Sequence, residues 1–131
     1  MEKKVLASPD SGFELTDVVD PSHLEALNDT FSEDIGLASA LLNEKARPIT
    51  FERNHCDFCE EVRKTEAGVQ QCIDSDKRGI SLARKRFKQT KKPEPVFYVC
   101  NQGLVDFCMP IVIGKEIVAY FFGGQFRCSC K

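Results

Sequence analysis

The end of the chain carries the pattern that most restricts its fold, because three stretches rich in β-branched and aromatic residues follow one another with only short breaks. Val96 to Cys100 is followed by the turn residues Asn101-Gln102-Gly103. Leu104 to Ile113 and Glu116 to Phe126 flank Gly114-Lys115, and a two-residue loop that begins with glycine is typical of a β-hairpin. The pattern predicts a meander of three consecutive antiparallel strands.

Helical signals come earlier in the chain. Asp20-Pro21 combines an N-capping residue with a proline at the first helical position, and Gly36 suits the end of that helix. Apolar residues recur at helical spacing again in the middle of the chain, until Pro93 stops the pattern. Short apolar runs over residues 37–42 and 47–51, with a turn between them, predict two further strands.

The predicted order is therefore a helix, two strands, a helical middle and three strands. This order predicts an α+β domain built on a five-stranded antiparallel sheet with helices covering one face. A chain of 131 residues has the length of one ordinary domain. We expect residues 1–19 to be a flexible lead-in and residues 20–131 to form the domain.

The composition is that of a globular domain inside the cell. Apolar residues make up 42% of the chain, which is enough for a core. No apolar stretch approaches the roughly 20 residues of a bilayer-spanning helix, and the N-terminus lacks the apolar region of a signal peptide. We therefore expect a cytoplasmic protein without membrane segments, in which the seven cysteines are not a set of structural disulfides.

The charge is distributed unevenly along the chain. Residues 1–76 carry 7 basic and 17 acidic side chains, whereas residues 77–131 carry 11 basic and 3 acidic ones. Most of the positive charge lies between Lys77 and Lys92. Such a run suggests nucleic acid or an acidic partner, and it is more commonly a solvated helix face, so both interpretations stay open.

Four of the cysteines have a spacing that suits a sensor based on metal or redox chemistry. Cys56 and Cys59 form a C-x-x-C pair, and with Cys72 and Cys100 they offer four thiolates for zinc or an iron–sulfur cluster. His55 is a further candidate ligand. Cysteine is also among the residues most often buried, so the same side chains suit a core. A thioredoxin-like role is disfavoured, because no parallel βαβ pattern surrounds the C-x-x-C.

Asp106 stands out in an otherwise apolar strand, between Val105 and Phe107. An ionised carboxylate buried alone is costly, so Asp106 either faces solvent or lines a cavity and binds something there. Tyr98 and Gln125 lie in the same meander and have the same two possibilities. No glycine-rich phosphate loop is present, and only two histidines are available as a catalytic base, so the sequence argues against an enzyme.

Several segments, in order, resemble the PocR family of sensory domains. Phe58 to Arg63 resembles the family's "FC…R" segment, and Cys72 to Asp76 resembles its "C…SD" segment. Tyr98 to Phe107 resembles "Y-x-C-H-A-G-L-x-D-F", which is the most specific of these stretches, and Gly124-Gln125 matches a closing "GQ". The resemblance covers roughly residues 20–127, which is most of the chain.

The resemblance implies a PAS-like fold that serves as the sensory domain of a bacterial or archaeal signalling or transcription-regulatory system. It implies a small organic ligand, such as a short diol, in a pocket between the sheet and the helical middle. It also implies an output module, fused or acting in trans, such as a DNA-binding domain, a histidine kinase or a diguanylate cyclase, and pairing as a homodimer. The residues expected to line the pocket are Phe58, Cys59, Tyr98, Cys100, Asn101, Asp106, Phe107, Phe122 and Gln125.

The departures from the family pattern are Asn101, Gln102 in place of an alanine, and the additional cysteines Cys56, Cys128 and Cys130. The family's histidine after the strand cysteine is Asn101 here, and asparagine forms hydrogen bonds but does not titrate near neutrality. Cys56 is a cysteine that the family pattern does not require. The chain also ends shortly after the "GQ" strand, where family members continue into further helices, so we expect a sensory domain without its output module.

Overall fold

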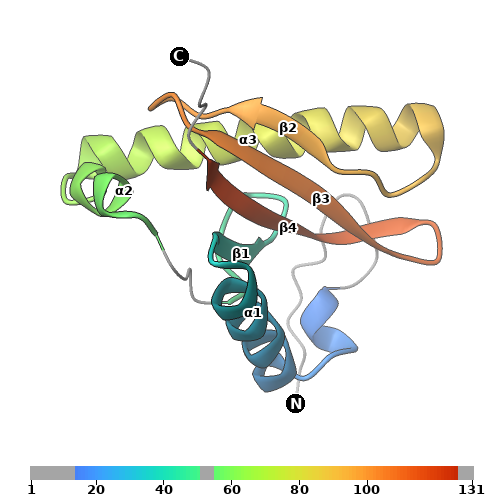
Figure 1. The fold of residues 1–131 in the computed structure, drawn as a ribbon. Helices are drawn as coiled ribbons and strands as arrows, with labels where there is room; N and C mark the ends of the chain where they lie inside the picture. Colours follow the sequence, from blue (N-terminus) through green and yellow to red (C-terminus); the bar gives the residue numbers. More distant parts are fainter. Residues whose placement is uncertain (1–13, 51–54, 127–131) are drawn as a thin grey trace.

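A four-stranded antiparallel sheet forms the centre of the structure, a computed structural model that describes residues 14–50 and 55–126 (Figure 1). The strands lie in the order β1-β4-β3-β2, and the α+β class and the C-terminal meander are confirmed. Gly114, the first residue of the β3–β4 loop, has a φ of 66°, as the predicted hairpin requires. The strands are β1 (Ala38–Leu42), β2 (Val96–Val99), β3 (Val105–Ile113) and β4 (Glu116–Phe126).

The fifth strand, predicted over residues 47–51, is not formed in its described part. A single bridge joins Leu42 to Pro48, because proline has no N–H group with which to continue a ladder. The backbone N–H of Leu41 donates instead to the side-chain oxygen Oγ1 of Thr50, at 3.1 Å. The prediction of five strands is therefore wrong, although the segment still covers the end of β1.

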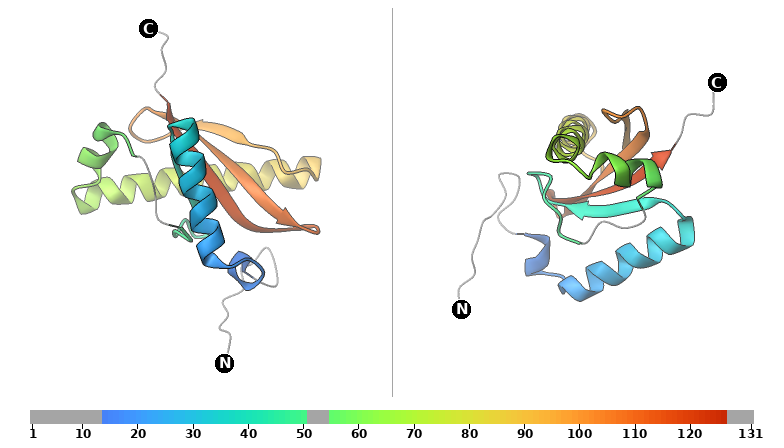
Figure 2. Two further views of the ribbon diagram at one scale, coloured as in Figure 1. Left: turned by 60° about the horizontal axis from the view of Figure 1, so that its bottom comes forward. Right: turned by 90° about the vertical axis from the view of Figure 1, so that its left-hand side faces the viewer.

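Helices cover both faces of the sheet, so the prediction of helices on one face only is also wrong. The helix α3 (Glu66–Thr90) packs on β2 and β3, and α1 (Pro21–Ile35) packs on β1 from the opposite side (Figure 2, right). Side chains alternate along a strand, and accordingly Leu42 belongs to the core beneath α3 while its neighbour Leu41 belongs to the core beneath α1.

The helix α1 begins and ends where the sequence predicts. The Asp20 side chain caps its first turn by accepting a hydrogen bond from the Ser22 N–H at 2.9 Å, and Gly36 ends it with a φ of 80°. The short 3-10 helix Leu15–Asp17 precedes it, and Leu15 is buried against the α1 side of the core. The end of the expected lead-in thus contacts the core, while residues 1–13 lie outside the described part of the chain.

A tight corner joins α2 (Asp57–Val62) to α3. Thr65 caps α3 by accepting a hydrogen bond from the Gly68 N–H at 3.0 Å. A Cβ atom on Gly68 would lie 1.8 Å from the carbonyl oxygen of Val62, so only glycine allows the two helices to approach this closely. The corner places α2 beside the first turns of α3 (Figure 1).

The basic run from Lys77 to Lys92 lies mainly on the outer side of α3. Within it, Arg86 forms a salt bridge with Glu94 at 2.8 Å, and Arg78 donates a hydrogen bond to the carbonyl oxygen of Val99. Both contacts hold α3 against the segment that contains β2. Binding of nucleic acid by the basic run stays a prediction. In the described part of the chain, no helix has the length and apolar character needed to cross a membrane.

Candidate functional site

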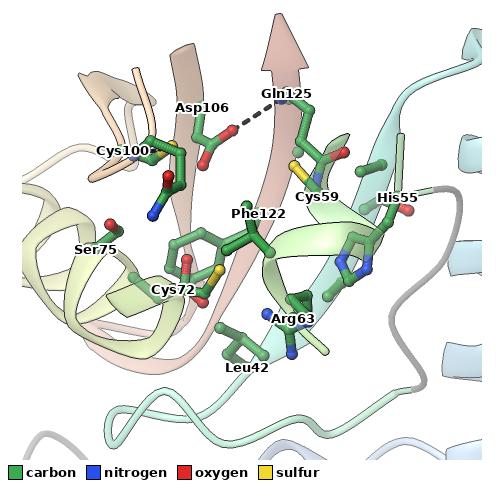
Figure 3. A pocket seen from close by; sticks show the side chains of 18 of the residues that line it. Leu42, His55, Cys59, Arg63, Cys72, Ser75, Cys100, Asp106, Phe122 and Gln125 are labelled. Atoms are coloured by element: carbon green, nitrogen blue, oxygen red, sulfur yellow. Dashed lines mark hydrogen bonds between the residues drawn. The ribbon is translucent and has the colours of Figure 1, made fainter. Parts of the chain in front are cut away.

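A cavity of about 80 Å³ lies between the sheet, α2 and the first half of α3 (Figure 3). A single water molecule needs only about 10–15 Å³ of such space, so the cavity has room for a small organic molecule. Its wall combines apolar residues of β1 and β4 with polar and sulfur-containing residues of α2, α3 and β3. The lining includes Ala38, Ala40, Leu42, Val62 and Phe122, the cysteines Cys59, Cys72 and Cys100, and the polar residues Ser39, His55, Arg63, Gln71, Ser75, Asp76, Gln102, Asp106 and Gln125.

A β-bulge in β4 holds the Asp106 carboxylate at this cavity. The pairing passes from Val105 with Phe126 to Asp106 with Gly124, which leaves Gln125 as the extra residue, at a φ of 67°. The N–H of Gln125 is thereby released from the ladder and donates to Oδ1 of Asp106 at 2.8 Å. Among the described residues, only Gln125 donates a hydrogen bond to the Asp106 carboxylate. The second oxygen of Asp106 is therefore available to a ligand.

Burial controls the acidity of the groups around the cavity. Burial raises the pKa of Asp106, although a backbone hydrogen bond acts against the shift. Burial, together with the neighbouring Cys56 thiol, raises the pKa of Cys59 to about 12. Burial also raises the pKa of Cys72, while a hydrogen bond from Arg63 acts in the opposite direction. At neutral pH, Cys59 and Cys72 are therefore neutral thiols, which are less reactive than thiolates.

The four cysteines predicted as metal ligands do not form a tetrahedral set. Cys59, Cys72 and Cys100 surround the cavity from three different segments (Figure 3). Cys56, the N-cap of α2, is exposed. Across residues 14–50 and 55–126, no group of three or more His, Cys, Asp or Glu side chains is arranged to hold a metal ion. The described residues thus hold no preformed set of three or more ligands, although three of the cysteines line the same cavity.

Five of the nine residues predicted for the pocket line this cavity. Cys59 reaches it from α2, Cys100 from the turn after β2, and Asp106 and Gln125 from β3 and β4. Phe122, predicted as an apolar wall, lies on the same side of β4 as the cavity (Figure 3).

Phe107 and Phe58 lie away from the cavity, which corrects the prediction for both. Phe107 follows Asp106 in β3, so its ring points to the opposite face of the sheet, where it covers Gly123 and lies 6.1 Å from the Phe97 ring. Phe58 lies on the outer side of α2 and is 51% exposed.

Tyr98 and Asn101 do not line the cavity either, and each forms a hydrogen bond to a residue that does. The Tyr98 hydroxyl donates to Asp76 at 3.4 Å, and burial raises the pKa of Tyr98. The Asn101 side chain donates to the Gln71 carbonyl oxygen at 3.1 Å and accepts from Arg78 at 3.0 Å. Asn101 therefore fastens the turn after β2 to α3, a structural role that needs no titratable group.

Sequence reasoning did not place Arg63 and Asp76 in the site, although both lie in segments that resemble the family. Arg63 lies four residues after Cys59, and Asp76 lies four residues after Cys72. Residues four apart share one face of a helix, so the cysteine that lines the cavity predicts a second lining residue one turn later. This spacing was the signal that could have identified both.

A small cavity between a sheet and its helices, with an apolar wall and a few polar groups that include Asp76 and Asp106, is typical of domains that bind small molecules. Residues 17–130 match the family described as the sensory domain found in PocR, and the chain therefore belongs to the PocR sensory-domain family. The regulatory protein PocR of Salmonella typhimurium is 30% identical to it over 99 residues, which are 76% of this chain. The chain spans only 31% of the length of that relative. No solved structure matches the chain.

Proposed function

We propose that this sensory domain binds a small uncharged molecule with two hydroxyl groups, such as a short diol, in the cavity beside Asp106. The position of the Asp106 carboxylate carries the proposal. One oxygen is held by the Gln125 N–H at 2.8 Å, and the other is directed toward the cavity (Figure 3). A buried carboxylate oxygen without a donor favours a ligand that brings one, and a hydroxyl group does so without adding charge.

The rest of the wall suits the remainder of such a molecule. Ala40, Leu42 and Phe122 offer apolar contacts for a methyl or methylene group. Arg63, on the α2 side, has five N–H donors and can serve both the Cys72 thiol and a second hydroxyl group. The cavity thus combines an acceptor, a donor and an apolar surface within the space of a molecule with a few heavy atoms.

We infer that ligand binding is passed on to an output module of a regulatory protein. This inference is supported by the similarity to a regulatory protein, in which the matched region makes up 31% of the length. The output is a DNA-binding domain, a histidine kinase or a diguanylate cyclase, fused to this domain or acting in trans in the cytoplasm. Pairing as a homodimer belongs to the same proposal, and sedimentation equilibrium tests it.

Isothermal titration calorimetry with propane-1,2-diol tests the ligand class. Propan-1-ol, which lacks one hydroxyl group, should bind more weakly, because it leaves one polar partner in the cavity unpaired. Asp106→Asn should weaken diol binding by about 10- to 100-fold, the effect of losing a hydrogen bond to a charged group. Gln89→Ala, at an exposed position near the far end of α3, is the matched control and should bind as the wild type does. Unchanged binding in both Asp106→Asn and Gln125→Ala would show that the site is assigned wrongly.

A cysteine-held zinc ion or iron–sulfur cluster is the second candidate, favoured by one observation. Three cysteines, Cys59, Cys72 and Cys100, converge on the cavity from three segments. Metal analysis and visible absorption spectra of anaerobically purified protein distinguish the two functions. Stoichiometric metal that is lost in a Cys59→Ser, Cys100→Ser variant would establish this second candidate, and folded metal-free protein would eliminate it.

A further inference from the structure

Two thiols lie side by side at the start of α2. Cys56 is the N-cap of α2 and Cys59 is its third residue, two positions at which each side chain can reach the backbone of the other residue. The first turn is closed by a hydrogen bond from the Glu60 N–H to the Cys56 carbonyl oxygen at 3.0 Å. The Cys56 thiol is close enough to contribute to the raised pKa of Cys59.

The two thiols differ in their surroundings. Cys56 is exposed to solvent, whereas Cys59 is 7% exposed and lines the cavity (Figure 3). One member of the pair is thus accessible to a reagent in solution, and the other belongs to the proposed ligand site.

The backbone of Cys56 is also linked to the Asp106 carboxylate. The Cys56 N–H donates to the side-chain oxygen Oε1 of Gln125 at 2.7 Å. The backbone N–H of the same Gln125 donates to Oδ1 of Asp106 at 2.8 Å. A single residue therefore connects the start of α2 to the group that we assign to ligand binding.

We propose that Cys56 and Cys59 form a reversible disulfide by exchange with a small disulfide of the glutathione class, and that this disulfide weakens ligand binding in the adjacent cavity. The second half of this proposal rests on the function proposed above. Cys56 is one of three cysteines that the family pattern does not require, with Cys128 and Cys130, so the switch is a property of this chain in particular.

The exchange proceeds in two balanced steps. The exposed Cys56 thiolate attacks one sulfur of the small disulfide, whose S–S bond breaks and releases one small thiol. Cys59 then loses its proton and attacks the Cys56 sulfur of the mixed disulfide, which releases the second small thiol. The protein loses two electrons and two protons, and the small disulfide gains both to become two thiols.

The new bond alters the cavity through both cysteines. A disulfide holds its two Cβ atoms about 3.8 Å apart, so the Cys59 sulfur turns from the cavity toward Cys56. Cys56 adjusts at the same time, which weakens its hydrogen bond to Gln125 and loosens the support of Asp106. The loss of about one hydrogen bond corresponds to roughly fivefold weaker binding.

Oxidised glutathione, added to the reduced full chain, tests the proposal. We expect the intact mass to fall by two hydrogen atoms, a peptide map to show Cys56 joined to Cys59, and reducing agent to reverse the change. Amide hydrogen exchange at Cys56 should become faster after oxidation, and calorimetry with propane-1,2-diol should show the weaker binding. Cys56→Ser should prevent the disulfide and keep the reduced affinity, because serine is a good N-cap. Cys72→Ser, the matched control for pairing, should still form the disulfide.

Other outcomes overturn the proposal. A map that joins Cys59 to Cys72 or to Cys100, or a permanent glutathione adduct on Cys56, contradicts the pairing. Unchanged exchange at the Cys56 amide contradicts the link to Gln125. Failure of the diol to bind the reduced protein overturns the proposed function alone, because the mass, the map and the exchange rates are measured without ligand.

Discussion

Asp106 is the single acidic residue of the apolar strand β3, and its burial links the stability of the domain to pH. Burial raises the pKa of Asp106 in the folded protein above the value of about 3.9 expected in the unfolded chain. Between these two pKa values the folded state binds more protons than the unfolded state. The contribution of Asp106 to stability therefore decreases as the pH rises through this window, and an ionised Asp106 destabilises the ligand-free protein at neutral pH.

Replacement of Asp106 by asparagine should raise the free energy of unfolding at pH 7 by about 1 kcal/mol. The asparagine side chain keeps an oxygen for the Gln125 N–H and carries no charge to desolvate. The gain should vanish below about pH 4, where the wild-type carboxyl group is protonated in both states. Urea unfolding of both proteins at several pH values measures the difference. A difference that stays constant with pH would contradict the assigned desolvation of Asp106.

At the scale of elements, α3 is held on the sheet by a close approach at Gly79. A Cβ atom at this position would lie 2.5 Å from Cε1 of Tyr98, whose ring is buried beneath the helix. The Tyr98 ring also contacts Phe122 edge-on, with 6.5 Å between the ring centroids, so it has little freedom to move. The glycine is therefore a packing requirement in the middle of a helix that would otherwise favour alanine.

Gly79→Ala should destabilise the protein by about 1–3 kcal/mol, because the added methyl group overpacks the contact with Tyr98. Helix propensity alone predicts the opposite sign, a gain of about 1 kcal/mol. Thermal or urea unfolding decides between the two. Gln89→Ala, on the exposed side of the same helix, should change stability by less than about 0.5 kcal/mol. A stabilised Gly79→Ala would show that the Tyr98 ring moves aside freely.

The sequence predicts the ends of elements better than it predicts their positions in space. Asp20-Pro21 and Gly36 mark the ends of α1, and Gly114 marks the β3–β4 loop, because caps and turns depend on neighbouring residues. The side of the sheet that each helix covers depends on contacts between distant segments, so helical periodicity could not show that α1 and α3 lie on opposite faces.

The candidate site was predictable only in part, because some of its features depend on neighbouring residues and others on contacts between distant segments. Asp106 is an unusual residue in an apolar strand, which left it either at solvent or at a cavity, and the resemblance to the family then assigned it to the pocket. Phe107 could have been excluded, because adjacent residues of a strand face opposite sides of the sheet. The bulge at Gln125, which orients Asp106, has no sequence signal of its own, since it is set by pairing between β3 and β4.

At the scale of the whole molecule, two cores share one sheet. The core beneath α3 contains both tyrosines of the chain, Tyr98 and Tyr120, and the core beneath α1 contains Leu15 and Leu24. The strands β1 and β4 contribute to both cores. Neither core can therefore be lost without disturbing strands that the other one needs, and we expect the described domain to unfold as one unit.

Leu24→Ala tests this cooperativity. The substitution removes a side chain that is 5% exposed in the α1 core and should cost about 2–4 kcal/mol. Tyrosine fluorescence reports on the opposite core, and far-ultraviolet circular dichroism reports on the whole chain. The midpoints of urea unfolding by both probes should coincide and shift together. A tyrosine transition that stays at the wild-type midpoint would show that the two cores unfold separately.

The length of α3 has a mechanical consequence. Its first turns line the cavity, and its last turn lies at the opposite end of the domain (Figure 1). Its 25 residues, at about 1.5 Å each, form a rod of about 37 Å. A tilt of about 5° at the cavity end displaces the other end by about 3 Å, through the length of the rod alone. Under the proposed function, a tilt of this size around the ligand would move Thr90 by about the length of a hydrogen bond.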